Sequence, residues 1–301
     1  MQAWCSYSKV RGVVLLSYDA CSDLRLCRQE TAASVSYLAE SLLQSWKRSG
    51  VVDPINVLDL CTGTGCIPLL FHHELFKQPS IEPKIGRVVG VDISPQALKL
   101  SEDNKAKQLH EQCVYGSSNP TKLDTLRNLR FVQADILADE DSSSSVMSKL
   151  RDINPAQPNY EVLISNPPYI SSAAFRITTA ASVRRYEPKL ALVPPHSPTQ
   201  HVVEDGDAFY PKLYDIAKSV GSKVVLFEVA DMEQACRVAA MAGEHWATVE
   251  IWRDDPSAAV GETEYADAGH GERRSVRVRG QGNGRSVVAY TNEGSQWCLT
   301  I

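Results

Sequence analysis

Asn166-Pro167-Pro168-Tyr169 brings together groups that could hold a planar NH2 group for reaction. The two prolines fix φ and have no N–H, so their carbonyl oxygens stay free to accept hydrogen bonds. The Asn166 side-chain oxygen and the Pro167 carbonyl can engage both hydrogens of an amide or amino group, and the Tyr169 ring can pack on its planar face. This positioning would serve methyl transfer from a sulfonium donor without a covalent intermediate. The alternative interpretation is a rigid turn after a strand.

A glycine-containing turn follows another apolar run, between Asp59 and Gly65. Glycines without Cβ atoms allow backbone to approach a ligand at the edge of a sheet. A single G-x-G also fits a tight turn, or a nicotinamide or flavin site. Pro68 stands where the dinucleotide pattern needs its third glycine, which disfavours NAD. The residues expected to bind a cofactor here are Asp59, Cys61, Thr62, Gly63, Thr64 and Gly65.

Carboxylates end the next two apolar runs. Asp92 would lie at the carboxyl end of a strand, where it can accept hydrogen bonds from both ribose hydroxyls of an adenosine. Its alternative role is to cap the helix entered at Pro95, which Ser94 would do better. Asp135, with Ile136 beside it, falls where the exocyclic amine of adenine would sit. Together with Asp59, these acids make three strand-end carboxylates in chain order, which predict an adenosine site without phosphate.

Strand-like and helix-like runs alternate along the chain and must position these residues. A helix-like run at 32–47 leads in. Short, continuous apolar strands joined by helices indicate a parallel sheet covered on both faces. We therefore predict an α/β, doubly wound, Rossmann-like fold with a mostly parallel seven-stranded sheet. The expected strands are 57–60, 88–91, 129–134, 162–165, 223–229, 247–252 and 286–291, and the expected helices are 67–76, 95–109, 208–220 and 232–241.

The composition is that of one main globular domain: 301 residues, 43% hydrophobic and 22% charged. A formal net charge of -5 provides no basic field for nucleic acid, so a protein or small-molecule partner is expected. The apolar run at 13–16 is too short to span a bilayer, so no membrane partner is expected. Eight cysteines without metal-type spacing predict reduced thiols and no metal site. Residues 1–18 contain Lys9, Arg11 and no acid, which is compatible with a transit peptide.

Two segments interrupt the alternation and are expected to be mobile surface loops: 139–145, rich in acids and serines, and 253–285, rich in glycine and charge. Within the second we predict a flexible insertion at 256–284. An alternative is a basic contact strip, but we favour a solvated insertion. The strip would contain Arg273, Arg274, Arg277 and Arg279. His72 and His73 are expected on a helix surface, because adjacent helical positions point to different sides.

Together the motifs resemble class I methyltransferases and, within them, the HemK/PrmC-type release factor glutamine methyltransferases. Besides the motifs above, the resemblance includes Arg28-Gln29-Glu30-Thr31, Arg185-Tyr186-Glu187-Pro188 and Leu226-Phe227-Glu228. Asn-Pro-Pro-Tyr is shared with adenine-N6 methyltransferases, whereas Arg-Tyr-Glu-Pro favours the glutamine enzymes. The resemblance implies S-adenosyl-L-methionine as cofactor. It also implies N5-methylation of the Gly-Gly-Gln glutamine of a peptide chain release factor.

The sequence departs from the family's pattern in three places. Cys61 stands where the family usually has glycine, and its side chain narrows the loop. Cys27 stands where the family usually has proline. The stretch before Arg28 is short for the family's N-terminal helical domain, which leaves docking of the release factor open. The insertion has no counterpart in the family. We expect residues 1–50 to form an N-terminal segment with a lead-in helix and residues 51–301 to form the methyltransferase domain.

Two alternatives to the glutamine methyltransferase stay open at this point. A nucleic-acid adenine-N6 methyltransferase predicts a basic cleft, and a non-catalytic relic that binds S-adenosylmethionine predicts a damaged site. Glu187 and Glu228 could act electrostatically, and neither is expected to be a general base. A monomer is expected, with a mitochondrial location and otherwise a cytoplasmic one.

Overall fold

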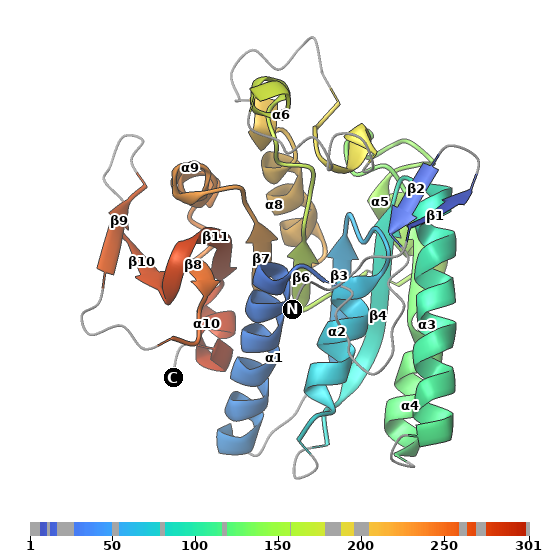
Figure 1. Cartoon of the computed structure of the whole chain (residues 1–301). Helices are drawn as coiled ribbons and strands as arrows, with labels where there is room; N and C mark the ends of the chain where they lie inside the picture. Colours follow the sequence, from blue (N-terminus) through green and yellow to red (C-terminus); the bar gives the residue numbers. More distant parts are fainter. Residues whose placement is uncertain are drawn as a thin grey trace.

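The computed structural model has a nine-stranded sheet at its centre, with helices on both faces (Figure 1). The strand order is β5-β4-β3-β6-β7-β11-β8-β10-β9. Two further strands, β1 (Tyr7–Val10) and β2 (Val13–Leu16), pair as an antiparallel hairpin. The structure describes residues 7–10, 13–16, 27–49, 54–78, 82–115, 119–156, 158–177, 188–195, 205–258, 264–268 and 275–298.

The first half of the sheet is parallel and the second half is mixed. β5, β4, β3, β6 and β7 pair in parallel, whereas β11 runs antiparallel to both β7 and β8. β10 pairs in parallel with β8 and antiparallel with β9. The strands are β3 (Ile55–Leu60), β4 (Ile85–Asp92), β5 (Arg130–Gln133), β6 (Val162–Ser165), β7 (Val224–Glu228), β8 (Thr248–Asp255), β9 (Glu264–Asp267), β10 (Ser275–Arg279) and β11 (Gln281–Tyr290).

Two apolar cores lie on opposite faces of the sheet. One packs α1, α2 and α4 against the sheet, and the other packs α5, α8 and α9. Completely buried aliphatic side chains on β3 and β6 explain why these runs read as continuously apolar. The helices are α1 (Gln29–Ser49), α2 (Cys66–Leu75), α3 (Pro95–Tyr115), α4 (Pro120–Asn128), α5 (Val146–Ile153), α6 (Ser172–Ile177), η1 (Lys189–Ala191), η2 (Asp205–Asp207), α8 (Tyr210–Ser219), α9 (Met232–Met241) and α10 (Asn292–Cys298).

The doubly wound α/β fold is confirmed, but the sheet is larger than the seven strands we predicted. The difference comes from the segment 253–285, which was expected to be a loop. Its described residues continue β8, form β9 and β10 and begin β11. Val276 and Val278 alternate with polar residues and are buried, so this segment adds apolar surface to the core. Among the described helices, none has the length and apolarity needed to span a bilayer.

Two arginines of the alternative basic strip, Arg277 and Arg279, form ion pairs within the sheet. The Arg279 Nε lies 3.2 Å from the Glu250 carboxylate, and an Arg277 Nη lies 3.5 Å from it. Glu250 is buried on β8 and also accepts a hydrogen bond from the Trp252 indole. The ion pairs therefore neutralise a buried carboxylate and join β10 to β8. Arg273 and Arg274 lie outside the described residues.

Replacing Val276 tests whether the insertion belongs to the core. Val276→Ala should lower the free energy of unfolding by about 2 kcal/mol, because the side chain is 1% exposed and its methyl groups would leave a cavity. Tyr265→Ser on β9 is the control, since that side chain is 62% exposed and should change stability by less than about 0.5 kcal/mol. Denaturant unfolding measures both, and equal small effects would contradict the packing role of the insertion.

Candidate active site

The parallel register aligns the carboxyl ends of four neighbouring strands. Leu60 pairs with Val91 on one side and with Ser165 on the other, and Ser165 pairs with Phe227. The residues that follow these positions therefore leave the sheet along one edge. They are Cys61, Asp92, Asn166 and Glu228. In Figure 1 this edge faces the top of the view, where α6 lies. The strand-end residues singled out from the sequence are thus brought together.

The loop between β3 and α2 is closed by three hydrogen bonds. The Thr62 amide donates to the Val91 carbonyl at 2.9 Å, and the Gly65 amide donates to the Thr62 carbonyl at 2.9 Å. The Gly63 amide donates to the Asp92 carboxylate at 2.8 Å. Three residues of the loop have positive φ: Cys61 at 61°, Gly63 at 54° and Gly65 at 74°. Glycine adopts such angles freely, whereas cysteine pays a steric cost for them.

The glycines differ in what surrounds them. A Cβ on Gly65 would lie 2.6 Å from the Phe131 ring, and one on Gly90 would lie 2.6 Å from the Thr62 hydroxyl. These two glycines therefore let β4, β5 and the loop approach each other. A Cβ on Gly63 would meet no atom within 4 Å. The loop thus presents open space at Gly63, where a ligand could contact the backbone.

Asp59 and Thr62 provide buried polar atoms that the described protein does not satisfy. Asp59 is fully buried, and neither of its carboxylate oxygens has a hydrogen-bond partner among the described residues. The Thr62 hydroxyl is also buried and faces Asp59, but neither side chain makes a hydrogen bond of good geometry within that part of the chain. Burial raises the pKa of Asp59 well above its usual range. Unsatisfied buried polar groups are costly and often mark a ligand or water site.

Asp92 divides its two oxygens between the loop and the next helix. One accepts from the Gly63 amide and the other from the Ser94 amide, both at 2.8 Å. The Ser94 hydroxyl accepts from the Ala97 amide at 3.2 Å, so Ser94 fills the capping role that we had weighed for Asp92. Burial raises the pKa of Asp92, which is opposed by these amide donors.

Asp135 lies beyond the end of β5, beside the end of β4. The Ala134 amide donates to the Asp92 carbonyl at 3.1 Å, which ties the two strand ends together. The Asp135 carboxylate accepts from the Leu137 amide at 2.9 Å, and Ile136 is 5% exposed. The expected mobile loop at 139–145 forms turns, and Ser145 makes a bridge with Asp135.

The Asn166–Tyr169 loop directly follows β6. Asn166 is half-buried, and Pro167 and Pro168 are buried. Tyr169 is also buried, and its hydroxyl donates to Glu228 Oε1 at 3.1 Å and accepts from an Arg28 Nη at 3.4 Å. Burial, followed by the Glu228 charge, raises the pKa of Tyr169 above its ordinary value. The phenol therefore acts as a neutral donor at physiological pH.

A network behind this loop was not anticipated from the sequence. The Gln234 amide nitrogen donates to the Tyr169 carbonyl at 3.2 Å and to Asp207 Oδ1 at 2.8 Å. Arg237 Nε donates to the other Asp207 oxygen at 2.7 Å. Gln234 and Asp207 are both buried. The partners come from distant parts of the chain, so sequence spacing gives no signal for this contact. The one visible feature is that Gln234 and Arg237 lie one turn apart on a predicted helix.

Other candidates prove to be structural or lie elsewhere. His72 is buried rather than on the surface, because α4 packs over it and Thr125 Oγ1 lies 2.8 Å from its Nε2. Burial lowers the pKa of His72 to about 3. Cys27 has a hydrogen bond with Cys66 at the start of α2, and this contact with burial raises the pKa of Cys27. Arg185, Tyr186 and Glu187 lie outside the described residues.

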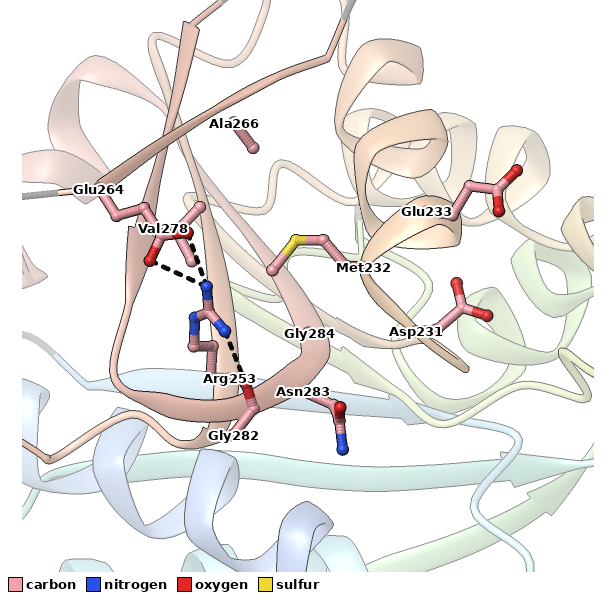
Figure 2. Close-up of a pocket in the computed structure, with 10 residues that line it drawn as sticks. All are labelled: Asp231, Met232, Glu233, Arg253, Glu264, Ala266, Val278, Gly282, Asn283 and Gly284. Atoms are coloured by element: carbon pink, nitrogen blue, oxygen red, sulfur yellow. Dashed lines mark hydrogen bonds and ion pairs between the residues drawn. The ribbon is translucent and has the colours of Figure 1, made fainter.

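A hollow of about 380 Å³ lies farther along the sheet, between the start of α9 and the strands β8 to β11 (Figure 2). Figure 2 shows Arg253 bound to the Glu264 carboxylate and to the Gly282 carbonyl. None of the predicted site residues lines this hollow. It is therefore separate from the strand-end cluster described above.

Cys61 should carry measurable backbone strain. Cys61→Gly is expected to be more stable than Cys61→Ala by about 1 kcal/mol, because only glycine adopts a φ of 61° without a steric clash. Comparing two small replacements separates this strain from the lost packing of the sulfur atom. Urea unfolding of both variants gives the difference, and equal stabilities would argue against strain at this position.

Comparison with known proteins gives relatives that are named as protein glutamine methyltransferases. A probable MRF1 mitochondrial N(5)-glutamine methyltransferase of Schizosaccharomyces pombe, mtq1, is 29% identical over 197 residues, 65% of this chain and 54% of the relative. The release factor glutamine methyltransferase of Chlorobaculum tepidum is 30% identical over 229 residues, 75% of this chain and 62% of the relative. The mitochondrial MRF1 N(5)-glutamine methyltransferase MTQ1 of Saccharomyces cerevisiae is 30% identical over 140 residues, 46% of this chain and 33% of the relative.

No family model matches the chain. The chain spans 54% and 62% of the lengths of the first two relatives, so the similarity concerns part of each protein. The matched proteins carry the activity that the motifs had suggested, and the sheet has the predicted doubly wound form. The chain is thus a sequence relative of the HemK/PrmC-type glutamine methyltransferases of release factors.

Proposed function

We propose that this chain transfers a methyl group from S-adenosyl-L-methionine to the N5 nitrogen of a protein glutamine, the Gly-Gly-Gln glutamine of a peptide chain release factor. The observation that carries the proposal is the alignment of the glycine loop and Asn166–Tyr169 at one sheet edge, set by the pairing of Leu60 with Ser165. This alignment puts a candidate cofactor site and a candidate amide site on neighbouring strands.

The residues around the glycine loop fit an adenosyl cofactor. Asp59 and Thr62 have buried polar atoms without partners in the described protein, and the backbone is open at Gly63. Asp92 and Asp135 follow neighbouring strand ends and would accept hydrogen bonds from ribose and adenine, with Ile136 as an apolar wall. When bound, S-adenosyl-L-methionine would supply an electrophilic methyl group on its sulfonium.

Asn166, Pro167, Pro168 and Tyr169 would act on the glutamine amide. An amide nitrogen is a poor nucleophile because its lone pair is delocalised. The Asn166 side-chain oxygen and the Pro167 carbonyl would accept its two hydrogens, which fixes the plane of the amide, while the Tyr169 ring would cover one face. The burial of both prolines and of Tyr169 would keep water from this side of the site.

The same relatives support the partner and the location that we propose. The two yeast proteins are named as mitochondrial methyltransferases of MRF1, which supports a mitochondrial location and a release factor as substrate. The net charge of -5 supports a protein substrate over a nucleic acid.

Methyl transfer to defined acceptors tests the proposal. With labelled S-adenosyl-L-methionine, the purified chain should label a mitochondrial release factor and should fail to label its Gly-Gly-Ala variant, because that variant lacks the acceptor nitrogen. Double-stranded DNA serves as a rival acceptor. Label on DNA would replace the proposal with an adenine methyltransferase, and cofactor binding without any transfer would favour a non-catalytic relic.

Two substitutions test the division of roles. Asp92→Ala should raise the dissociation constant of S-adenosyl-L-methionine by about 10- to 100-fold, because it removes charged acceptors and opens the glycine loop. Asn166→Ala should leave that constant nearly unchanged and lower kcat on the order of 100-fold. Calorimetry and single-turnover transfer measure the two effects, with Asp103→Ala on the exposed side of α3 as control. Equal loss of cofactor binding in both variants would refute the division.

A further inference from the structure

The buried Glu228 carboxylate joins two segments that are far apart in the sequence. It leaves the end of β7 at a position adjacent to Asn166 in the register and is 3% exposed. Glu228 Oε2 accepts the hydroxyl of Thr31, in the first turn of α1, and Oε1 accepts the hydroxyl of Tyr169 at 3.1 Å. The carboxylate thus connects the start of α1 to the Asn166–Tyr169 loop.

We infer that Glu228 is a positioning residue for methyl transfer, which acts by fixing the orientation of the Tyr169 ring. The inference rests on the proposed function, in which that ring covers the amide of the substrate glutamine. Glu228 itself need not touch a reactant. Its role is to hold the phenol oxygen in one place, so that the ring forms a fixed wall of the amide site.

Hydrogen bonds also hold the Tyr169 backbone at its carbonyl and at the next amide, so the hydroxyl contact is the one that orients the ring. Gln234 donates to the Tyr169 carbonyl, and the next amide, that of Ile170, donates to the Leu192 carbonyl at 2.9 Å. A Cβ on Gly206 would lie 2.6 Å from the Tyr169 carbonyl oxygen, so this side is tightly packed. With the main chain held, two side-chain torsions remain: the position of the phenol oxygen fixes χ1, and the preference of the O–H bond for the ring plane then favours one value of χ2.

A carboxylate suits this place better than a neutral amide. Its two oxygens accept two hydroxyl donors at once, whereas a glutamine would offer one acceptor and one NH2 donor. Burial raises the pKa of Glu228, and the Thr31 and Tyr169 hydroxyls, with the Arg28 and Arg285 charges, oppose that rise. These four groups favour the ionised form that the two hydroxyls need.

A double-mutant cycle tests whether Glu228 acts through Tyr169. Glu228→Gln and Tyr169→Phe should each lower kcat by about tenfold, with the dissociation constant of S-adenosyl-L-methionine changed by less than about twofold. The double variant should be little slower than the slower single variant, because both changes act on the hydrogen bond between Glu228 and the Tyr169 hydroxyl. Losses that multiply to about 100-fold would overturn the inference, since Glu228 would then act independently of the ring.

Hydrogen exchange supplies a readout that does not require activity. The amides of Asn166, Tyr169 and Ile170 should exchange faster in Glu228→Gln and in Tyr169→Phe than in the unmodified chain, because the loop opens more often once the ring is released. Glu250→Gln is the matched control, because Glu250 is an equally buried, hydrogen-bonded glutamate on the same sheet, away from the Tyr169 contact. Under native conditions, where these amides exchange by local opening, Glu250→Gln should leave their exchange unchanged.

The outcomes separate this inference from the proposed function. Faster exchange at 166–170 in the two site variants, without methyl transfer by the unmodified chain, would support the positioning contact and reject the glutamine activity. Methyl transfer by the unmodified chain, with exchange and kcat unaffected by Glu228→Gln, would overturn the positioning role and leave the activity standing. If Glu228→Gln does not fold, Tyr169→Phe alone decides by the same two measurements.

Discussion

The hydrogen bond from the Gly63 amide to the Asp92 carboxylate is the contact on which the shape of the glycine loop depends. It joins the turn after β3 to the end of β4, in a loop where Cys61, Gly63 and Gly65 all have positive φ. A hydrogen bond to a charged group contributes about 1.5 to 3 kcal/mol, enough to offset the backbone cost at the one residue that is not glycine. The acid that shapes the loop is therefore also the acid that we propose to bind a ribose.

The Asn166–Tyr169 loop, which we propose to hold the substrate amide, is built in a different way. Its shape comes from side chains that reach Tyr169 from distant segments: Thr31 through Glu228, and Gln234 directly at the carbonyl. α1 also contacts β11 through Ser34 and Ser286, so the helix cannot shift without disturbing the buried core. The first turn of α1 is consequently part of the site, although it precedes the glycine loop in sequence.

Much of the fold follows from local pattern. The apolar runs predicted β3, β6 and α9 closely, because their residues are buried on the expected faces and α9 begins at the Asp231 cap. β9 and β10 were missed, since glycine and charge dominate their surroundings. Yet β10 shows the alternation of a strand, with Val276 and Val278 inward and arginines paired to Glu250. The alternation was thus visible in the sequence but hidden by the charged surroundings, whereas the buried Glu250 partner could not be found from local pattern.

The site residues also differ in whether local pattern or a contact between distant segments determines them. Strand-end acids and glycines can be found from sequence because the parallel fold itself brings the ends of successive strands to one edge. The contact between Thr31 and Glu228 joins residues 197 positions apart, and neither residue has a spacing that signals it. The family resemblance includes both segments, 28–31 and 226–228, but does not say what either segment does. The buried carboxylate supplies that reason: the α1 segment and the end of β7 meet at the tyrosine hydroxyl, so each constrains the same ring.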